Sequence, residues 1–322
     1  MLFIDNEPYL ANPAPLDNAF RSDVLDGLAS RPRTIPARWL YDERGSELFE
    51  DITRLPEYYP ARTELAILRT HARAIAAIVG AVGTVVEFGA GSSTKTPTLL
   101  SAVAPSIYVP VDICGDFLRK SVANLAALFP KLSIRPVEGD FSCPLALPSQ
   151  GASRRRLGFF AGSTIGNLAP SEAVDLLRTF GRTLGKDAML LIGIDRIKDV
   201  GLLVPAYDDA QGVTARFNLN LLRRINRELG GRVPIEAFRH VARWSAAEAR
   251  IEMHLQAVRD LRFDIAGHAF SMAEGETIHT ENSHKYGSRD ARLLLRAGGW
   301  TPVAEWTDAD GLFALHLASV AS

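Results

Sequence analysis

Residues 85–98, VVEFGAGSSTKTPT, decide the expected fold of this chain. Two valines lead into Glu87, a Gly-Ala-Gly turn follows at 89–91, and hydroxyl residues then surround Lys95. This order is typical of a parallel strand that ends in a tight turn and leads into a helix. Backbone N–H groups and small residues at such a turn let a ligand approach closely. We therefore expect a small ligand here.

Apolar segments alternate with helical segments around this turn. Short apolar runs bounded by turn residues predict strands, and apolar positions three or four residues apart predict helices. The strands are expected at residues 84–88, 106–112, 132–137, 157–161 and 188–194. The helices are expected at residues 63–80, from the turn to about 103, 117–128, and 171–184 with Ser171 as N-cap. The alternation predicts a doubly wound, Rossmann-like parallel sheet of the α/β class.

The pattern changes after residue 198. A long helix is expected at 213–229, and residues 250–258 and 261–265 alternate as antiparallel strands with one solvent face would. The chain is expected to end with a helix at 288–296 and a hairpin of 303–307 and 313–318.

The length and composition favour two domains. The chain has 322 residues, 47% hydrophobic and 23% charged, which is enough apolar material for one large core or two moderate ones. We expect a ligand-binding sheet domain at residues 62–197 and 287–322. A smaller capping domain is expected at residues 1–61 and 198–286.

Composition also bounds the partners and the compartment. The formal net charge of -1 gives no long-range attraction for nucleic acid or an anionic membrane, so a small molecule is expected. Cys114 and Cys143 are expected to be free thiols, and the histidines show no metal-ligand spacing. The N-terminus indicates an irregular arm to about residue 16 rather than a signal peptide, and no apolar run approaches the ~20 residues that span a bilayer. We expect a cytoplasmic monomer without a metal.

The glycine turn narrows the choice of ligand. The third glycine of the dinucleotide fingerprint is missing after Gly91, and Lys95 follows a threonine rather than the glycine of a P-loop. Asp112 ends the second strand, and Asp140 with Phe141 follows the third. Ligand groups on three successive strand ends suit S-adenosylmethionine (SAM), whose ribose takes a carboxylate acceptor and whose adenine takes an apolar face. The alternative that both aspartates only cap helices stays open.

Six longer motifs extend this interpretation over nearly the whole chain. They are TRLPEYYPARTE at 53–64, EFGAGSSTKT at 87–96, FAGSTIGNL at 160–168, AYDD at 206–209, IEMHLQA at 251–257 and HTENSHKY at 279–286. On these motifs the chain resembles the histidine-specific Nα-methyltransferase family of ergothioneine biosynthesis, which trimethylates L-histidine to hercynine. The resemblance implies a SAM-dependent N-methyltransferase with a class I methyltransferase sheet and a smaller α+β substrate-binding domain. S-adenosylhomocysteine would be the product, and no metal is implied.

The resemblance also implies which side chains bind the cofactor and the amino acid. The cofactor is expected at Tyr41, Gly89, Lys95, Asp112, Asp140 and Phe141, with Gly91 added from the glycine turn. The amino acid is expected at Tyr58, Asn167, Tyr207, Glu281 and Ser283, with Gly162 added from the loop after the fourth strand. Lys95 would pair with the cofactor's carboxylate, although an exposed lysine at the helix start stays open.

The substrate residues fit the chemistry of free histidine. Asn167 and Tyr207 can donate hydrogen bonds to its carboxylate. Glu281 and Ser283, two residues apart, face one side of an extended segment and can hold both ring nitrogens, although the pair alone also fits a solvated turn. A bound phenylalanine or leucine would leave the Glu281 carboxylate without a hydrogen-bond partner, at a cost of several kcal/mol. Met253, a deformable apolar residue, is expected to help set the pocket size against tryptophan.

Methyl transfer is expected to be a direct in-line displacement by the neutral α-amine, with the protein supplying orientation and excluding water. Tyr41, Tyr58 or a water molecule are the candidate proton acceptors. Tyrosine rings would attract the growing ammonium by about 0.5–2 kcal/mol. Two other functions stay open: N-methylation of another amino acid such as tryptophan or tyrosine, and a non-catalytic SAM-binding module.

Overall fold

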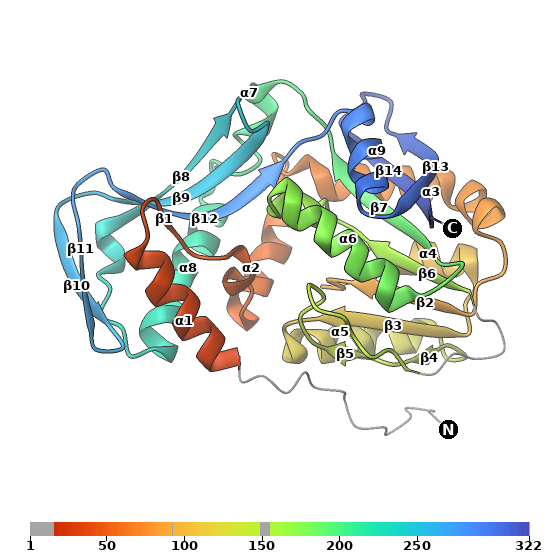
Figure 1. Cartoon of the computed structure of the whole chain (residues 1–322), viewed down its shortest axis with the longest axis horizontal. Helices are drawn as coiled ribbons and strands as arrows, with labels where there is room; N and C mark the ends of the chain where they lie inside the picture. The colour runs from red at the N-terminus through yellow and green to blue at the C-terminus, as the bar shows by residue number, and fades with distance from the viewer. Residues whose placement is uncertain (1–15, 92, 149–154, 322) are drawn as a thin grey trace. The chain divides into compact units, whose positions relative to one another are not determined.

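The computed structural model describes residues 16–91, 93–148 and 155–321 (Figure 1). The described chain divides into two units: residues 60–197 and 285–321 form the first, and residues 16–59 and 198–284 form the second. The predicted N-terminal arm, Ser92 and most of the loop expected at 150–156 lie outside the described residues.

The first unit contains, within its described residues, an eight-stranded sheet. Its strands lie in the order β13 (Trp300–Thr307), β14 (Phe313–Val320), β7 (Met189–Asp195), β6 (Arg156–Phe160), β2 (Thr84–Phe88), β3 (Ile107–Asp112) and β4 (Ser133–Ile134), and β5 (Val137–Glu138) also pairs with β3. The strands from β7 to β4 and β5 run parallel, whereas β14 is antiparallel to β7 and β13 to β14. The order reverses beside β2, so the predicted Rossmann-like class I methyltransferase sheet is confirmed.

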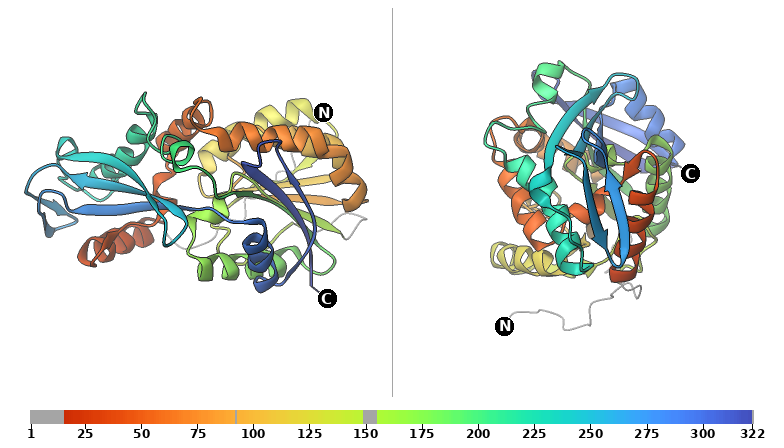
Figure 2. Two further views of the ribbon diagram at one scale, coloured as in Figure 1. Left: turned by 90° about the horizontal axis from the view of Figure 1, so that it is seen from above. Right: turned by 90° about the vertical axis from the view of Figure 1, so that its left-hand side faces the viewer.

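Helices cover both faces of this sheet (Figure 2). The face covered by α3 (Tyr59–Val79), α4 (Thr96–Val103) and α5 (Gly115–Leu128) receives Val85 and Phe159. The face covered by α6 (Pro170–Leu184) and α9 (Ser288–Ala297) receives their neighbours Val86 and Phe160. Because successive strand residues point to opposite faces, burial on both sides requires the continuous apolar runs seen in the sequence.

The third predicted strand, 132–137, is wrong as a single element. It consists of the separate short strands β4 and β5. Arg135 donates its backbone N–H to the Tyr108 carbonyl at 2.8 Å, but Pro136 has no N–H to continue the ladder. Proline therefore interrupts this edge of the sheet.

The predicted N-cap of α6 is also wrong by two residues. Ala169 occupies the cap position, Pro170 begins the helix, and Ser171 lies inside the first turn. The Glu172 carboxylate accepts the Ala169 N–H at 2.8 Å. Proline suits the first helical position because its missing N–H would have no partner within the helix.

The second unit combines a four-stranded sheet with helices among its described residues. The sheet order is β1 (Arg33–Thr34), β12 (Thr277–His284), β9 (Arg250–Ala257) and β8 (Phe238–Ser245), and a hairpin of β10 (Leu261–Ile265) and β11 (His268–Met272) stands apart. The helices include α1 (Leu16–Ala29), α2 (Glu43–Thr53), α7 (Val200–Leu203) and α8 (Val213–Glu228), with α8 against β8 and β9. The sequence predicted β9, β10 and α8 but missed β8, because this edge strand buries only Phe238 and Ala242 fully and lacks a clear apolar alternation.

Two helical glycines are expected to respond oppositely to alanine. A Cβ on Gly27 of α1 would lie 1.8 Å from the Thr34 carbonyl oxygen, so Gly27→Ala must displace α1 from β1 and should lower the free energy of unfolding by roughly 1–3 kcal/mol. A Cβ on Gly181 of α6 would meet, among the described residues, only the Trp300 ring at 4.0 Å, so Gly181→Ala should raise the free energy of unfolding by about 0.5–1 kcal/mol. Urea unfolding of the two variants and wild type measures both effects, and equal shifts would contradict the assigned packing.

Candidate active site

The reversal of strand order places the ends of β2 and β6 side by side in the first unit. After β2, Gly89 and Gly91 adopt left-handed backbone angles, with φ of +70° and +51°. The N–H groups of Gly89 and Ala90 bond to the Val111 carbonyl at 2.9 and 3.1 Å. A Cβ on Gly91 would meet no atom of the other described residues within 4 Å, so among these residues the turn leaves open space beside its backbone. Open α/β sheets bind ligands at such a reversal of strand order.

Asp112 joins the turn after β2 to the turn after β3. Its Oδ2 accepts the Gly91 N–H at 2.9 Å and its Oδ1 accepts the Cys114 N–H at 3.0 Å. The carboxylate therefore ties two loops together, while α5 begins only at Gly115. Burial raises the pKa of Asp112, although the hydrogen bonds from backbone N–H groups oppose that rise. Each oxygen retains acceptor capacity, so the group can also accept the hydroxyls of a ribose.

Asp140 and Phe141 follow β5 beside the glycine turn. Asp140 Oδ1 accepts the Ser142 N–H at 2.9 Å, and residues 141–148 form a turn, a bend and irregular chain rather than a helix. The Phe141 ring lies 5.5 Å from Phe160 and 6.5 Å from Phe88, between ring centroids. A Cβ on Gly89 would lie 3.5 Å from this ring. An aromatic surface thus borders the turn.

Lys95 is not the exposed lysine that the sequence left open. It occupies the N-cap position of α4, its side chain is 18% exposed, and its ammonium pairs with the buried Glu64 carboxylate of α3. Glu87, also buried, has other partners: it accepts hydrogen bonds from Thr96 Oγ1 at 2.7 Å and the Tyr108 hydroxyl at 2.5 Å. Burial raises the pKa of Glu87 to about 7.

The loop after β6 carries the other predicted polar residues of this unit. Gly162 has φ of +77°, and its N–H donates to Glu64 Oε2 at 2.8 Å. Ser163 also has a left-handed backbone, and its hydroxyl accepts the Asp195 N–H at 2.9 Å. Asn167 closes the short 3-10 helix η2 (Thr164–Asn167) and is half-buried. The loop is therefore fixed to β7 and α3.

In the second unit, a β-bulge orients the predicted substrate residues. Ile278 pairs with Leu255 and Glu281 pairs with Met253, so the register shifts at Thr280. The Thr280 hydroxyl donates to the Met253 carbonyl at 3.0 Å. Directly opposed residues share a face, so the extra residue moves Glu281 to the face of Ile278, three positions earlier. Without the bulge, the strand would turn Glu281 to the opposite face.

Tyrosine hydroxyls meet Glu281 and Ser283, which are both buried. The Tyr207 hydroxyl and Ser283 Oγ lie 2.7 Å apart, and the Tyr41 hydroxyl lies 3.4 Å from Glu281 Oε1. The Tyr58 ring is 6.0 Å from that of Tyr207. The second unit thus brings together these five residues from distant segments, and the solvated turn that the sequence left open for Glu281 and Ser283 is excluded by their burial.

Further aromatic rings support Tyr41. Its ring lies 5.6 Å from Phe49 of α2 and 5.4 Å from Phe217 of α8. Burial, and then the Glu281 charge, raise the pKa of Tyr41 well above its usual value. Its hydroxyl therefore stays a neutral phenol that can donate to the carboxylate.

His240 and Asn218 hold the backbone of Tyr207 in place. The sequence did not indicate this role. His240 Nε2 lies 2.8 Å from the Tyr207 carbonyl oxygen, and Asn218 Nδ2 lies 2.9 Å from His240 Nδ1. Because the amide nitrogen donates to Nδ1, His240 carries its proton on Nε2 and donates it to Tyr207. The sequence offered no signal for this contact, since β8 was not recognised as a strand.

The chain is similar to known methyltransferases. A model of the family described as histidine-specific methyltransferase, SAM-dependent, matches residues 20–320. The histidine N-alpha-methyltransferase of Mycolicibacterium smegmatis is 43% identical, covering 96% of this chain and 98% of the relative. The chain belongs to this methyltransferase family.

Two further relatives extend the comparison. The histidine N-alpha-methyltransferase of Mycobacterium tuberculosis is 41% identical, covering 94% of this chain and 95% of the relative. Ergothioneine biosynthesis protein 1 of Neurospora crassa is 30% identical and covers 89% of this chain, which corresponds to 33% of that longer protein. The predicted SAM-dependent methyltransferase and its cofactor are therefore confirmed at the level of the family.

Some residues of the family-like motifs serve the fold. In AYDD, the Asp209 carboxylate accepts the Val213 and Thr214 N–H groups at 2.9 and 2.8 Å and so caps α8. In HTENSHKY, the fully buried Lys285 pairs with the equally buried Asp195 at 2.7 Å within the first unit. Within the described residues, no cluster of three or more His, Cys, Asp or Glu has metal-binding geometry, and no helix is long and apolar enough to cross a bilayer.

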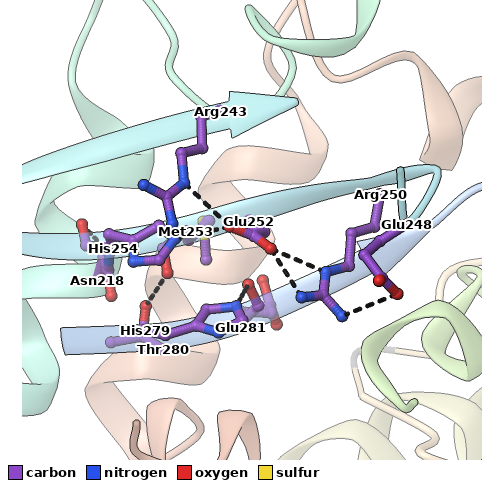
Figure 3. Close-up of polar contacts among 10 residues, drawn as sticks. All are labelled: Asn218, Arg243, Glu248, Arg250, Glu252, Met253, His254, His279, Thr280 and Glu281. Atoms are coloured by element: carbon purple, nitrogen blue, oxygen red, sulfur yellow. Dashed lines mark hydrogen bonds and ion pairs between the residues drawn. The ribbon is translucent and has the colours of Figure 1, made fainter. Parts of the chain in front are cut away.

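The opposite face of β9 and β12 carries a separate charged cluster, shown in Figure 3. Glu252 accepts hydrogen bonds from Arg243 at 3.0 Å and from Arg250 at 2.7 Å, and His254 Nε2 lies 3.1 Å from it. The His254 and His279 rings stack at 4.7 Å, and His279 Nε2 lies 3.1 Å from the Glu281 carbonyl oxygen. This cluster therefore lies on the opposite side of the bulged segment from the Glu281 side chain.

Acidification is expected to destabilise the protein through this cluster. Burial lowers the pKa of His254 from 6.5 to about 4. Between these pH values the imidazole is protonated in the unfolded chain but neutral in the folded protein, so the free energy of unfolding decreases as pH falls. Burial alone would raise the pKa of Glu252, but hydrogen bonds from Arg250, His254 and Arg243 lower it from 4.5 to about 2. The stability that ionised Glu252 gives to the folded state is therefore lost as pH falls from 4.5 towards 2.

The variant His254→Gln tests the first of these two steps. Its unfolding free energy, measured with urea, should fall less steeply than that of wild type between pH 6.5 and 5, because the titrating group is gone. His268→Gln, at an exposed position of β11, is the matched control and should keep the wild-type slope. A wild-type slope in His254→Gln would show that His254 does not contribute.

Proposed function

We propose that this protein transfers three methyl groups from SAM to the α-amine of L-histidine, giving hercynine for ergothioneine biosynthesis. The observation that carries the substrate assignment is the placement of Glu281 and Ser283 on one buried face, with the Tyr41 and Tyr207 hydroxyls against them. The names of the mycobacterial relatives support the same substrate. We further propose that it acts as a cytoplasmic monomer.

The cofactor is assigned to the first unit and to Tyr41. Gly89 and Gly91 leave open backbone for its methionine part, Asp112 accepts its ribose hydroxyls, and Asp140 with Phe141 contacts its adenine. Lys95, one of whose three N–H donors is used by Glu64, pairs with its carboxylate. When bound, SAM supplies an electrophilic methyl group on a sulfonium.

The amino acid is assigned to seven side chains or backbone positions. These are Tyr58, Gly162, Asn167, Tyr207, Met253, Glu281 and Ser283, and we assign residues 1–61 and 198–286 as the substrate-binding domain. Glu281 and Ser283 hold the two imidazole nitrogens, and phenylalanine or leucine would leave the Glu281 carboxylate unpaired. Met253 opposes Glu281 in the β-ladder, so it borders the ring and limits its size.

The protein's contribution to the reaction is orientation. The neutral α-amine attacks in line, and the residues around it exclude water. Tyr41 remains a neutral phenol, so it positions groups by donating a hydrogen bond. The proton that the amine loses passes to a water molecule, either directly or through the Tyr58 hydroxyl, which accepts it while giving its own hydrogen to the water. The tyrosine rings favour the ammonium that forms by about 0.5–2 kcal/mol.

Mass spectrometry of a reaction with L-histidine and SAM tests this function directly. We expect a product that carries three additional methyl groups, together with S-adenosylhomocysteine. Parallel reactions with L-tryptophan and L-tyrosine should show little turnover. Turnover of tryptophan without histidine would transfer the assignment to another amino acid, and SAM binding without any methyl transfer would indicate a non-catalytic module.

The variant Glu281→Ala should separate substrate binding from cofactor binding. Loss of a buried charged hydrogen-bond partner should lower kcat/KM for histidine by roughly a hundredfold. The Kd for SAM, measured by calorimetry, should change by less than about threefold, because the partner that is lost belongs to the imidazole. Glu248→Ala, at a half-exposed carboxylate of the same unit, is the control and should behave as wild type. Equal losses of SAM and histidine binding would make Glu281 a structural residue.

A further inference from the structure

Glu64 is a carboxylate of the first unit that belongs to none of the residue groups assigned to the site from the sequence. It projects from α3 and is fully buried. A buried carboxylate is stable only when it is paired and hydrogen-bonded. Its partners are therefore informative.

One oxygen of Glu64 serves two loops. Oε2 pairs with the Lys95 ammonium and also accepts the Gly162 N–H at 2.8 Å. Lys95 follows β2 and Gly162 follows β6, the neighbouring strands at which the sheet order reverses. A Cβ on Gly162 would lie 3.8 Å from Lys95 Nζ, so the two loops are in contact range around this carboxylate.

The surroundings of Oε1 restrict the orientation of the Glu64 side chain. Among the described residues, Oε1 has no hydrogen-bond partner, and it lies against β7, where a Cβ on Gly193 would be only 2.1 Å away. Only glycine at this position of the strand leaves room for the carboxylate. Its orientation is thus fixed by packing on one side and by Lys95 and Gly162 on the other.

Glu64 is also the acid that neutralises Lys95, although Glu87 is nearby. Glu87 directs its Oε2 to Thr96 and Tyr108, and burial raises its pKa to about 7, which makes its ionised form less favoured than that of an ordinary glutamate. The Lys95 side chain is 18% exposed, and its ammonium uses one of its three donors on Glu64. It can therefore hold an anionic ligand while Glu64 holds it in place.

We propose that Glu64 is a positioning residue for methyl transfer, which holds the Lys95 ammonium and the Gly162 backbone in the arrangement that SAM and the amino acid require. This inference rests on the proposed function, because it takes Lys95 and Gly162 as cofactor and substrate contacts. It predicts that the two loops lose their alignment together when the carboxylate is removed.

Calorimetry with SAM and steady-state kinetics on Glu64→Gln, Lys95→Met and the double variant test the proposal. Glu64→Gln should raise the Kd for SAM roughly tenfold or more, because a charged hydrogen bond to the lysine is lost. It should also raise KM for histidine through the Gly162 loop. The double variant should be no worse than the poorer single variant, because both changes remove one interaction. Asp175→Asn, an exposed carboxylate of α6, is the matched control and should leave all constants unchanged.

Glu64→Asp keeps the charge but is one methylene shorter, so it guards against a variant that fails to fold. It should show a smaller loss of SAM affinity in the same direction. Wild-type constants in Glu64→Gln or Glu64→Asp, additive effects with Lys95→Met, or a change in Tm alone would overturn the proposal. Failure of the wild-type protein to bind SAM or methylate histidine would instead overturn the proposed function.

Discussion

The sheet of the first unit is buried on both faces, and this constraint determines where polar chemistry can lie. Its strands send alternate residues such as Val85 and Val86 into two apolar cores, so charged groups find partners at the strand ends. Asp112 is the last residue of β3, and Lys95 and Gly162 follow the carboxyl ends of β2 and β6. The cofactor assignment and the role of Glu64 both depend on this arrangement.

Two buried ion pairs of the first unit join distant segments of the chain. Glu64 meets Lys95 and Asp195 meets Lys285, with each pair inside the first unit. Leaving one member of such a pair alone costs more than the pair itself contributes, so these contacts restrict which loop conformations are allowed. They fix geometry more than they add stability.

In the second unit, a single extra residue in β12 determines the orientation of Glu281. The bulge at Thr280 turns Glu281 to the face of Met253, while His279 and its stacked partner His254 remain on the other face. One strand therefore presents the Glu281 carboxylate, which we propose binds the substrate, on one side and a charged cluster on the other. Tyr41 and Tyr207, from other segments, complete the first side.

The sequence by itself determined four of the five predicted strands of the parallel sheet, the helices between them, the glycine turn and the family, because apolar periodicity, glycines and ordered motifs can be read along the chain. It also placed Glu281 and Ser283 on one face, since side chains two apart on a strand share a side. Only the tertiary structure decided that this face is that of Met253, that Glu64 pairs with Lys95, and that His240 supports Tyr207. These contacts join residues far apart in the chain, and a bulge or an edge strand such as β8 leaves no periodic signal, because packing against neighbouring strands creates it.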